Sequence, residues 1–236
     1  MSETDIGAAV AAAARSINQQ TTLEETLATI AAVARTSVPG FDQVGISTID
    51  RKGTVTTRAA TGELVWVLDR LQYSLGEGPC VDTLRGAQVV VAPRIRHDQR
   101  WPEYVPQAVE AGLKAQLAVK LYLDGEGTLG GLNLYSTRSE DIDDDAEAIA
   151  DLFAAHAAIA LGQVRQREGL QEALHSRKVI GQALGILMER YQMDDDRAFD
   201  FLLRTSSHAN IKLRDVAARL VDEANKPGTA PTHPPR

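Results

Sequence analysis

The stretch QLAVKLYLDGEGTLGGLNLYS, residues 116–136, decides the fold of the first part of the chain. Apolar residues alternate with other residues on both sides of its centre, which is typical of strands with one buried face. The centre reads Asp124-Gly125-Glu126-Gly127, and an Asp-Gly pair between two such runs is a strong signal for a hairpin turn. We therefore predict two antiparallel strands joined by a short turn.

The sequence before this hairpin predicts the rest of a sheet and its helices. Residues 44–48 and 55–61 read as a second hairpin, and residues 89–93 as a strand that Pro93 ends. A short helix is expected after the glycine-rich LGEGP, and further helices are predicted at 22–37, 64–72 and 106–112. Strands with helices at both ends indicate an α+β fold with an antiparallel sheet.

From about residue 142 to Tyr191 the pattern changes to one long helix with an apolar stripe. If unbroken, this helix is about 75 Å long at 1.5 Å per residue. Such a stripe cannot be buried on one small domain, so we expect a partner helix from a second copy of the chain. The alternative is two helices with a bend at Gly162 or Gly169.

Two shorter helices are predicted behind it, which makes a small three-helix bundle. Asp194 or Asp195 is expected to cap the first, which runs to about Ser206, and Asn210 is expected to cap the second. The resulting scheme has five parts: an N-terminal helical segment (1–21), the α+β domain (22–163), a helical connector (164–175), the bundle (176–226) and a disordered proline-rich tail (227–236).

Two glycines interrupt the first helix of the bundle, in VIGQALGILMERYQM at 179–193. A glycine inside a helix costs roughly 1 kcal/mol relative to alanine, and Gly181 and Gly185 incur this cost twice. Together with Ala183 they remove side-chain bulk. We predict that they allow close approach, first of another helix of the bundle and otherwise of a bound partner. On the packing reading, Gly185→Leu destabilises the bundle.

Composition narrows the function classes. The 236 residues carry a formal net charge of −7, so nucleic-acid binding requires a local basic face. Residues 176–226 hold nine Lys and Arg against eight Asp and Glu, a net +1 that leaves −8 for the rest of the chain. One cysteine, no secretory signal and no apolar run of membrane-spanning length predict a cytoplasmic protein that does not cross a membrane.

The sequence shows no catalytic or metal-binding constellation, so we expect no enzyme. LGEGP lacks the Lys-Ser/Thr ending of a phosphate-binding loop and is expected to shape a turn instead. Cys80 could be a redox sensor or a chromophore attachment point, but a lone cysteine is more often a small buried apolar residue. The isolated histidines, among them His97 and His156, form no metal-ligand spacing.

Three segments of the C-terminal part resemble the ANTAR domain, an RNA-binding module of bacterial transcription antiterminators. They are SRKVIGQALGILMER (176–190), AFDFLLRTSS (198–207) and NIKLRDVA (210–217). The front part resembles a GAF domain through SLGEGPCVDTLRGAQVVV, RWPEY and GGLNLYS. The order of the two matches an actinobacterial GAF–ANTAR architecture.

The resemblance implies a homodimer in which a GAF sensor controls RNA binding. The ANTAR parts would hold paired hairpins of leader transcripts, favouring read-through of a terminator, and an upstream signalling protein or a small-molecule ligand of unknown identity would act on the sensor. The candidate RNA-binding residues are Arg177, Lys178, Gly181, Gly185, Tyr191, Arg204, Lys212 and Arg214. The candidate GAF ligand pocket comprises Gly78, Cys80, Trp101, Tyr104 and Asn133.

The chain departs from the ANTAR pattern at three positions. The family commonly has lysine where Leu184 stands, and often a basic residue where Leu203 and Ile211 stand. Each phosphate-contacting cation contributes to RNA affinity through counterion release. An alternative hypothesis follows, in which the protein is a ligand-sensing or protein-interaction module whose degenerate ANTAR domain does not bind RNA.

Overall fold

The computed structural model describes residues 22–50 and 52–226. The described residues fall into two compact units, which we call unit 1 and unit 2. Along the chain, unit 1 ends at Val164 and unit 2 begins at Arg165. The predicted N-terminal helical segment (1–21) and the predicted disordered tail (227–236) lie outside the described residues.

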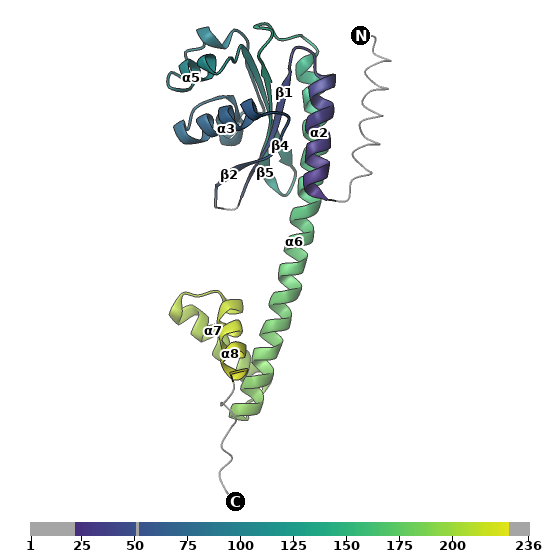
Figure 1. Cartoon of the computed structure of the whole chain (residues 1–236). Helices are drawn as coiled ribbons and strands as arrows, with labels where there is room; N and C mark the ends of the chain where they lie inside the picture. Colours follow the sequence, from purple (N-terminus) through teal and green to yellow (C-terminus); the bar gives the residue numbers. More distant parts are fainter. Residues whose placement is uncertain (1–21, 51, 227–236) are drawn as a thin grey trace, which may run out of the picture. The chain divides into compact units, whose positions relative to one another are not determined.

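Unit 1 is built around one antiparallel sheet of five strands, in the order β2-β1-β5-β4-β3 (Figure 1). This confirms the predicted α+β class. The predicted hairpin at 116–136 forms β4 and β5, which lie next to each other within the sheet. The strands are β1 (Gln43–Ile49), β2 (Val55–Ala60), β3 (Val89–Ala92), β4 (Ala115–Leu123) and β5 (Gly127–Ser136).

Helices cover both faces of the sheet. In Figure 1, α2 and the first part of α6 lie on one side of it, and α3 and α5 on the other. The helix α2 starts where the sequence predicts, because Thr22 and Glu25 form a reciprocal capping box. The helices of unit 1 other than α6 are α2 (Leu23–Ser37), α3 (Glu63–Leu75), α4 (Pro79–Arg85), the 3₁₀ turn η1 (Ile95–His97) and α5 (Tyr104–Glu110).

Alternation along β4 and β5 separates an apolar layer from a polar one. Leu117 and Val119 of β4 and Leu132 of β5 belong to the core cluster that includes α2 and α6. Their neighbours Gln116 and Asn133 point to the opposite face, as the period of two in a strand requires. Polar side chains are thereby buried between the sheet and the layer of α3, α4 and α5.

The helix α6 is continuous from Ala146 to Tyr191, so the alternative prediction, two helices separated by a bend, is wrong. In unit 1 the missing side chain of Gly162 leaves room for Leu123. A Cβ placed on it would come within 2.4 Å of a methyl carbon of Leu123, at the end of β4. By length and composition α6 alone among the described helices could cross a membrane, yet 44% of its most apolar window is buried inside the fold.

Unit 2 contains the rest of α6, α7 (Asp195–Ala209) and α8 (Leu213–Ala224). Its small core consists of Ala183, Leu187, Ala198, Leu202 and Ala217. Asp194 caps α7 by accepting a hydrogen bond from the backbone N–H of Arg197, as predicted.

Asn210 has a different role from the one predicted. It ends α7 in the left-handed conformation (φ 52°, ψ 42°), and the residue at the start of α8 is Lys212, which makes no side-chain cap. Asparagine is one of the few residues other than glycine that tolerate this conformation, and the same side chain that suits a helix start also suits a helix end.

Gly181 and Gly185 do not pack inside the bundle. At 100° per residue each lies about 160° around α6 from the buried Ala183, and a Cβ on either would meet no described atom within 4 Å. The predicted close packing against another helix of the bundle is therefore wrong, and so is the predicted overpacking by Gly185→Leu. The face that carries the glycines is exposed in the single chain.

Candidate sensor core and nucleic-acid interface

A buried polar network occupies the space between the sheet and the α3–α5 layer. We call it the Asp69 network, after the one carboxyl group in it. Strands β1, β2, β4 and β5 and helices α3, α4 and α5 all contribute. Its members are Ser47, Thr57, Asp69, Gln72, Tyr73, Cys80, Tyr104, Gln116, Asn133 and Tyr135.

Asp69 is held only by neutral donors. Thr57 Oγ1 donates to its Oδ2 at 2.6 Å. The hydroxyl of Tyr135 and the Nδ2 of Asn133 donate to its Oδ1, the latter at 3.3 Å. No lysine, arginine or histidine is among the side chains that hydrogen-bond to Asp69 in the described part of the chain. A carboxylate in this position keeps its hydrogen bonds but has no countercharge.

Burial dominates the electrostatics of Asp69, whose side chain is 1% exposed. Desolvation raises its pKa from 3.8 to about 6, although the hydrogen bonds from Thr57, Tyr135, Tyr73 and Asn133 each act to lower it. Because the pKa in the folded chain lies above its unfolded value, protonation of Asp69 stabilises the fold. That stabilisation is lost as the pH rises through about 6.

A second arm of the network runs through Gln72. Its Oε1 accepts hydrogen bonds from the backbone N–H of Cys80 at 2.9 Å and from Gln116 Nε2 at 3.2 Å. Gln116 in turn accepts from the hydroxyl of Tyr104 at 2.8 Å. Gly78 makes room for this arm, because a Cβ on it would lie 2.5 Å from Gln72 Oε1, and its φ of 122° also favours glycine.

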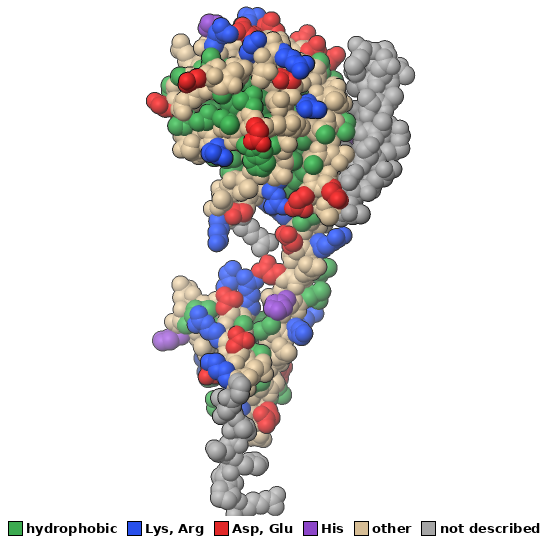
Figure 2. Space-filling view, in the orientation of Figure 1, with side chains coloured by type: hydrophobic (Ala, Val, Ile, Leu, Met, Phe, Trp, Pro, Cys, Tyr) green, Lys and Arg blue, Asp and Glu red, His purple; other side chains and the backbone are tan. Residues whose placement is uncertain are grey.

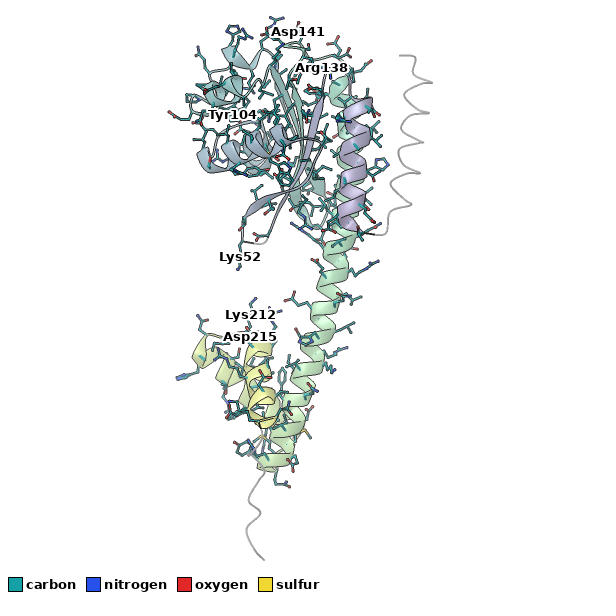
Figure 3. The ribbon with its side chains drawn as sticks, viewed as in Figure 1. Lys52, Tyr104, Arg138, Asp141, Lys212 and Asp215 are labelled. Carbon is teal, nitrogen blue, oxygen red and sulfur yellow. The ribbon has the colours of Figure 1, made fainter. Side chains whose placement is uncertain are left out.

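The structure brings most of the predicted pocket residues to this network. Cys80 and Asn133 are in contact at 3.2 Å, Gly78 backs Gln72, and Tyr104 reaches in from α5, which Figure 3 labels. Trp101 lies in the adjoining apolar cluster and donates its indole N–H to Asp82 at 3.0 Å. Gly78, Cys80, Tyr104 and Asn133 therefore belong to or border one network, and Trp101 lies beside it.

Sequence reasoning missed the centre of the site, Asp69. A signal was available in ELVWVLDRLQYSL (63–75), where Val65, Leu68, Asp69 and Gln72 follow the i, i+3, i+4, i+7 spacing of one helix face. A carboxylate and an amide on an otherwise apolar stripe indicate a buried polar site rather than a solvated surface.

Cys80 has the properties of a structural cysteine. It is fully buried, and desolvation raises the pKa of its thiol to about 12, with the charge of Asp69 acting in the same direction. The position near the start of α4 does not offset this. A thiol with a raised pKa is a poor nucleophile at neutral pH, which disfavours redox sensing or chromophore attachment here.

In unit 2, one of the predicted RNA contacts is already engaged. Arg214 of α8 forms an ion pair with Glu172 of α6 and a longer one with Asp215 at 3.5 Å. The start of α8, where Figure 3 labels Lys212 and Asp215, thus presents a guanidinium that is neutralised within the unit. Contact with RNA phosphate would require Arg214 to leave Glu172.

The other predicted basic residues are exposed but not gathered. Arg177 and Lys178 lie about 120° and 140° around α6 from Ala183, on either side of the glycine face, by 100° per residue. Arg204 is exposed on α7 and Lys212 at the start of α8. Figure 2 shows Lys and Arg side chains of unit 2 interspersed with Asp and Glu rather than collected in one patch.

Aromatic side chains that could stack on bases are more numerous than Tyr191 alone. Tyr191, the last residue of α6, is 58% exposed, and Phe199 and Phe201 of α7 are 41% and 43% exposed. Leu184, at the position where the family has lysine, is half-buried and packs against the core of unit 2. Among the described residues no group of three or more His, Cys, Asp or Glu side chains is placed to hold a metal ion.

Comparison with family models gives the same two domains. The GAF domain model matches residues 20–162, and the ANTAR domain model matches residues 168–221. A comparison with curated proteins finds no match.

Solved structures share the fold of the front part. The GAF domain of an Acinetobacter phosphoenolpyruvate-protein phosphotransferase has a TM-score of 0.56 at 14% identity, over 72% of this chain and 99% of that one. The corresponding domain from Coxiella burnetii gives 0.57 at 16%, over 70% and 98%. A domain of a putative two-component sensor histidine kinase from Sinorhizobium meliloti gives 0.52 at 17%, over 64% and 99%. At these identities the likeness concerns the fold alone.

Proposed function

Because this chain belongs to the GAF domain family and carries an ANTAR domain behind its GAF domain, we propose that it is a cytoplasmic, RNA-binding transcription antitermination regulator. In this proposal the GAF domain senses a signal or an upstream signalling protein. The observation that carries the proposal is the ANTAR match, which spans all three helices of unit 2. The boundaries proposed for the two domains are 22–163 and 176–226, with a helical connector between them.

The proposed RNA contacts are loops of paired hairpins in a leader transcript. Unpaired loop bases are exposed for stacking and hydrogen bonding, and Tyr191, Phe199 and Phe201 are exposed in unit 2. Arg177, Lys178, Arg204 and Lys212 would contact phosphate or base edges, and Arg214 would do so only by exchanging Glu172 for RNA. Gly181 and Gly185 lie on an open helix surface that the RNA backbone or a second helix can approach closely.

The proposed active form is a homodimer joined along α6. In unit 2 the large exposed apolar residues of α6 include Leu170, Leu174 and Met188, at 63%, 57% and 38% exposure. At 100° per residue they lie within about 40° of the side opposite Ala183, the same side as the two glycines. Exposed apolar residues on one helix face, with glycines among them, suit a parallel partner helix at close distance.

The mechanism has three links. A signal changes the GAF domain, the paired α6 helices change register or spacing, and the two bundles move so that each can hold one hairpin loop. Leu123 of β4, which sits against Gly162, provides a physical contact between the sheet and α6 within unit 1.

A gel-shift titration of the full chain, shown to be dimeric, with a paired-hairpin leader RNA tests the RNA-binding part. We expect binding that weakens steeply with added salt and weakens further in the double variant Arg204→Gln/Lys212→Gln. Arg197→Gln is the matched control, because Arg197 is held by Asp194 at the start of α7. No binding at low salt by the confirmed dimer would contradict the proposal.

A second candidate function is favoured by Leu184. Because this side chain packs against the core of unit 2, the position contributes to stability rather than to phosphate binding. The protein would then be a ligand-sensing or protein-interaction module with an ANTAR domain that does not bind RNA. Leu184→Lys separates the two: RNA binding that appears only in this variant assigns the natural chain to the second function.

A further inference from the structure

The Asp69 network has two features that a static core does not need. It contains a buried carboxyl group without a countercharge, and it contains one buried acceptor, Asn133 Oδ1, that has no hydrogen-bond partner among the described atoms. Buried polar groups are nearly always paired, so each unpaired one calls for a physical reason. The two groups are adjacent, since Asn133 Nδ2 lies 3.3 Å from Asp69 Oδ1.

We propose that the signal bound by the GAF core is a proton on Asp69, and that its binding reverses the side-chain amide of Asn133. This inference rests on the proposed sensor role of the GAF domain and names its input. A proton can enter the network without displacing a side chain, because it adds no heavy atom and the carboxyl group of Asp69 is there to bind it.

The ionised state corresponds to the arrangement in the structure. Asn133 Nδ2 faces three acceptors, namely Asp69 Oδ1 at 3.3 Å, Ser47 Oγ at 3.1 Å and Cys80 Sγ at 3.2 Å. An amide nitrogen has only two hydrogens, so it cannot satisfy all three at once. Its oxygen, turned the other way, accepts nothing.

In the protonated state the reversed amide gives donors to the oxygen of Asn133, the atom that is unpaired in the ionised state. The oxygen of Asn133 then faces the O–H of Asp69, the S–H of Cys80 and the hydroxyl of Ser47, all of which can donate. Thr57 Oγ1 continues to donate to the other carboxyl oxygen, Oδ2, at 2.6 Å, so the proposed proton lies on Oδ1, beside Asn133. The charge is removed and no atom has to travel far.

Of the network's members only Tyr73 is partly exposed, while the others are buried. Its hydroxyl hydrogen-bonds Ser47 and lies 3.4 Å from Thr57 Oγ1, which donates to Asp69 Oδ2. Hydroxyl groups thereby link the most exposed member of the network with Asp69.

Among the described residues no other group that faces Asp69 competes for the proton near pH 6. The titratable groups around it are Tyr73 from α3, Cys80 from α4, Tyr104 from α5 and Tyr135 from β5. Burial raises the pKa of each of them well above the usual value, so all four stay neutral. The strands β1, β2 and β4 contribute Ser47, Thr57 and Gln116, which do not titrate.

The test is a pH titration of the full-length protein by NMR, with carbon-13 in the aspartate carboxyl groups and nitrogen-15 in the asparagine side chains. We expect one aspartate carboxyl to titrate with a midpoint near pH 6, and the side-chain amide signals of Asn133 to move with the same midpoint. Asp69→Asn should remove that carboxyl signal and leave Asn133 insensitive to pH. Glu63→Gln, an exposed carboxyl at the start of the same helix, is the control and should change neither.

Thr57→Val is a second way to assign the titrating carboxyl signal to Asp69. It remains usable if the Asp69→Asn variant does not fold. Loss of this donor should move the midpoint to higher pH, since the hydrogen bond from Thr57 lowers the pKa. The inference is overturned if every aspartate titrates below about pH 4.5, close to the value of a free side chain, or if Asn133 does not follow the carboxyl. Because this titration needs no RNA, its failure counts against the proton site alone, and absent RNA binding counts against the proposed function alone.

Discussion

Gly181 and Gly185 are open positions in the single chain. They lower the stability of the helix, and no packing contact inside unit 2 offsets that loss. A methyl group on either would meet no described atom within 4 Å. We therefore expect Gly181→Ala and Gly185→Ala each to stabilise the dissociated chain by roughly 1 kcal/mol, the intrinsic helix preference of alanine over glycine. Urea unfolding at protein concentrations below those of dimer formation measures this.

Ala183→Leu is the contrasting variant on the same helix. Ala183 is fully buried, so the larger side chain should overpack the core and destabilise it by about 1–3 kcal/mol. A loss of stability in either glycine variant would contradict the open-surface reading. Weaker dimerisation or RNA binding in a stabilised Gly→Ala variant would show what the missing side chains leave room for.

At the scale of whole elements, the β4–β5 hairpin contacts α6 at Gly162, where the lack of a side chain leaves room for Leu123. Gly162→Ala should displace Leu123, whose methyl carbon lies 2.4 Å from the added Cβ, and lower the free energy of unfolding by about 1–3 kcal/mol. Leu123→Ala should remove most of that penalty. A double-mutant cycle by chemical denaturation therefore measures a coupling between the two residues.

Gly169→Ala is the matched control, since a Cβ at that position of α6 meets no described atom within 4 Å and should stabilise the helix. If Gly162→Ala behaves as Gly169→Ala does, Leu123 does not depend on the glycine and the contact between hairpin and helix is loose.

Local patterns predicted the elements well, because each depends on neighbours in the chain. Alternation predicted β4 and β5, the glycine-rich LGEGP predicted the short helix α4, and Asp194 marked the start of α7. The error at Asn210 arose because asparagine favours both helix starts and helix ends, and only the chain path decides between them.

Sites assembled from distant segments were harder to predict. Cys80, Tyr104 and Asn133 were named from family motifs, but Asp69, the carboxyl group of the same network, lies on α3 and was not among the predicted residues. The first of the two partners predicted for the glycines, another helix of the bundle, was wrong for a similar reason. A sequence shows where a side chain is missing. Whether that position faces the bundle or solvent depends on which side of α6 the bundle covers.

For the molecule as a whole, the proposed dimer makes a direct prediction. Leu170→Glu/Leu174→Glu should turn a dimer into a monomer in sedimentation experiments, because two charges would face each other across the paired helices. The unfolding free energy of the dissociated chain should stay within about 0.5 kcal/mol, since both side chains are largely exposed. Affinity for a paired hairpin should fall as the second bundle is lost.

Leu203→Glu is the control for this experiment. Leu203 is 47% exposed on α7, so the variant adds a charge at an apolar surface position away from α6 and should remain dimeric. A dimer that persists in the double variant would place the interface elsewhere in the chain.

The uncompensated carboxyl of Asp69 also bears on how this protein can evolve. Neutral or apolar residues in such a position commonly raise stability, so Asp69 has little reason to persist where heat resistance is the only trait under selection. In a library of variants screened for survival at high temperature, replacements of Asp69 should accumulate early. In a library screened for conditional read-through of a reporter gene, the aspartate should be retained. The difference between the two libraries would show that Asp69 is kept for regulation although its charge lowers stability.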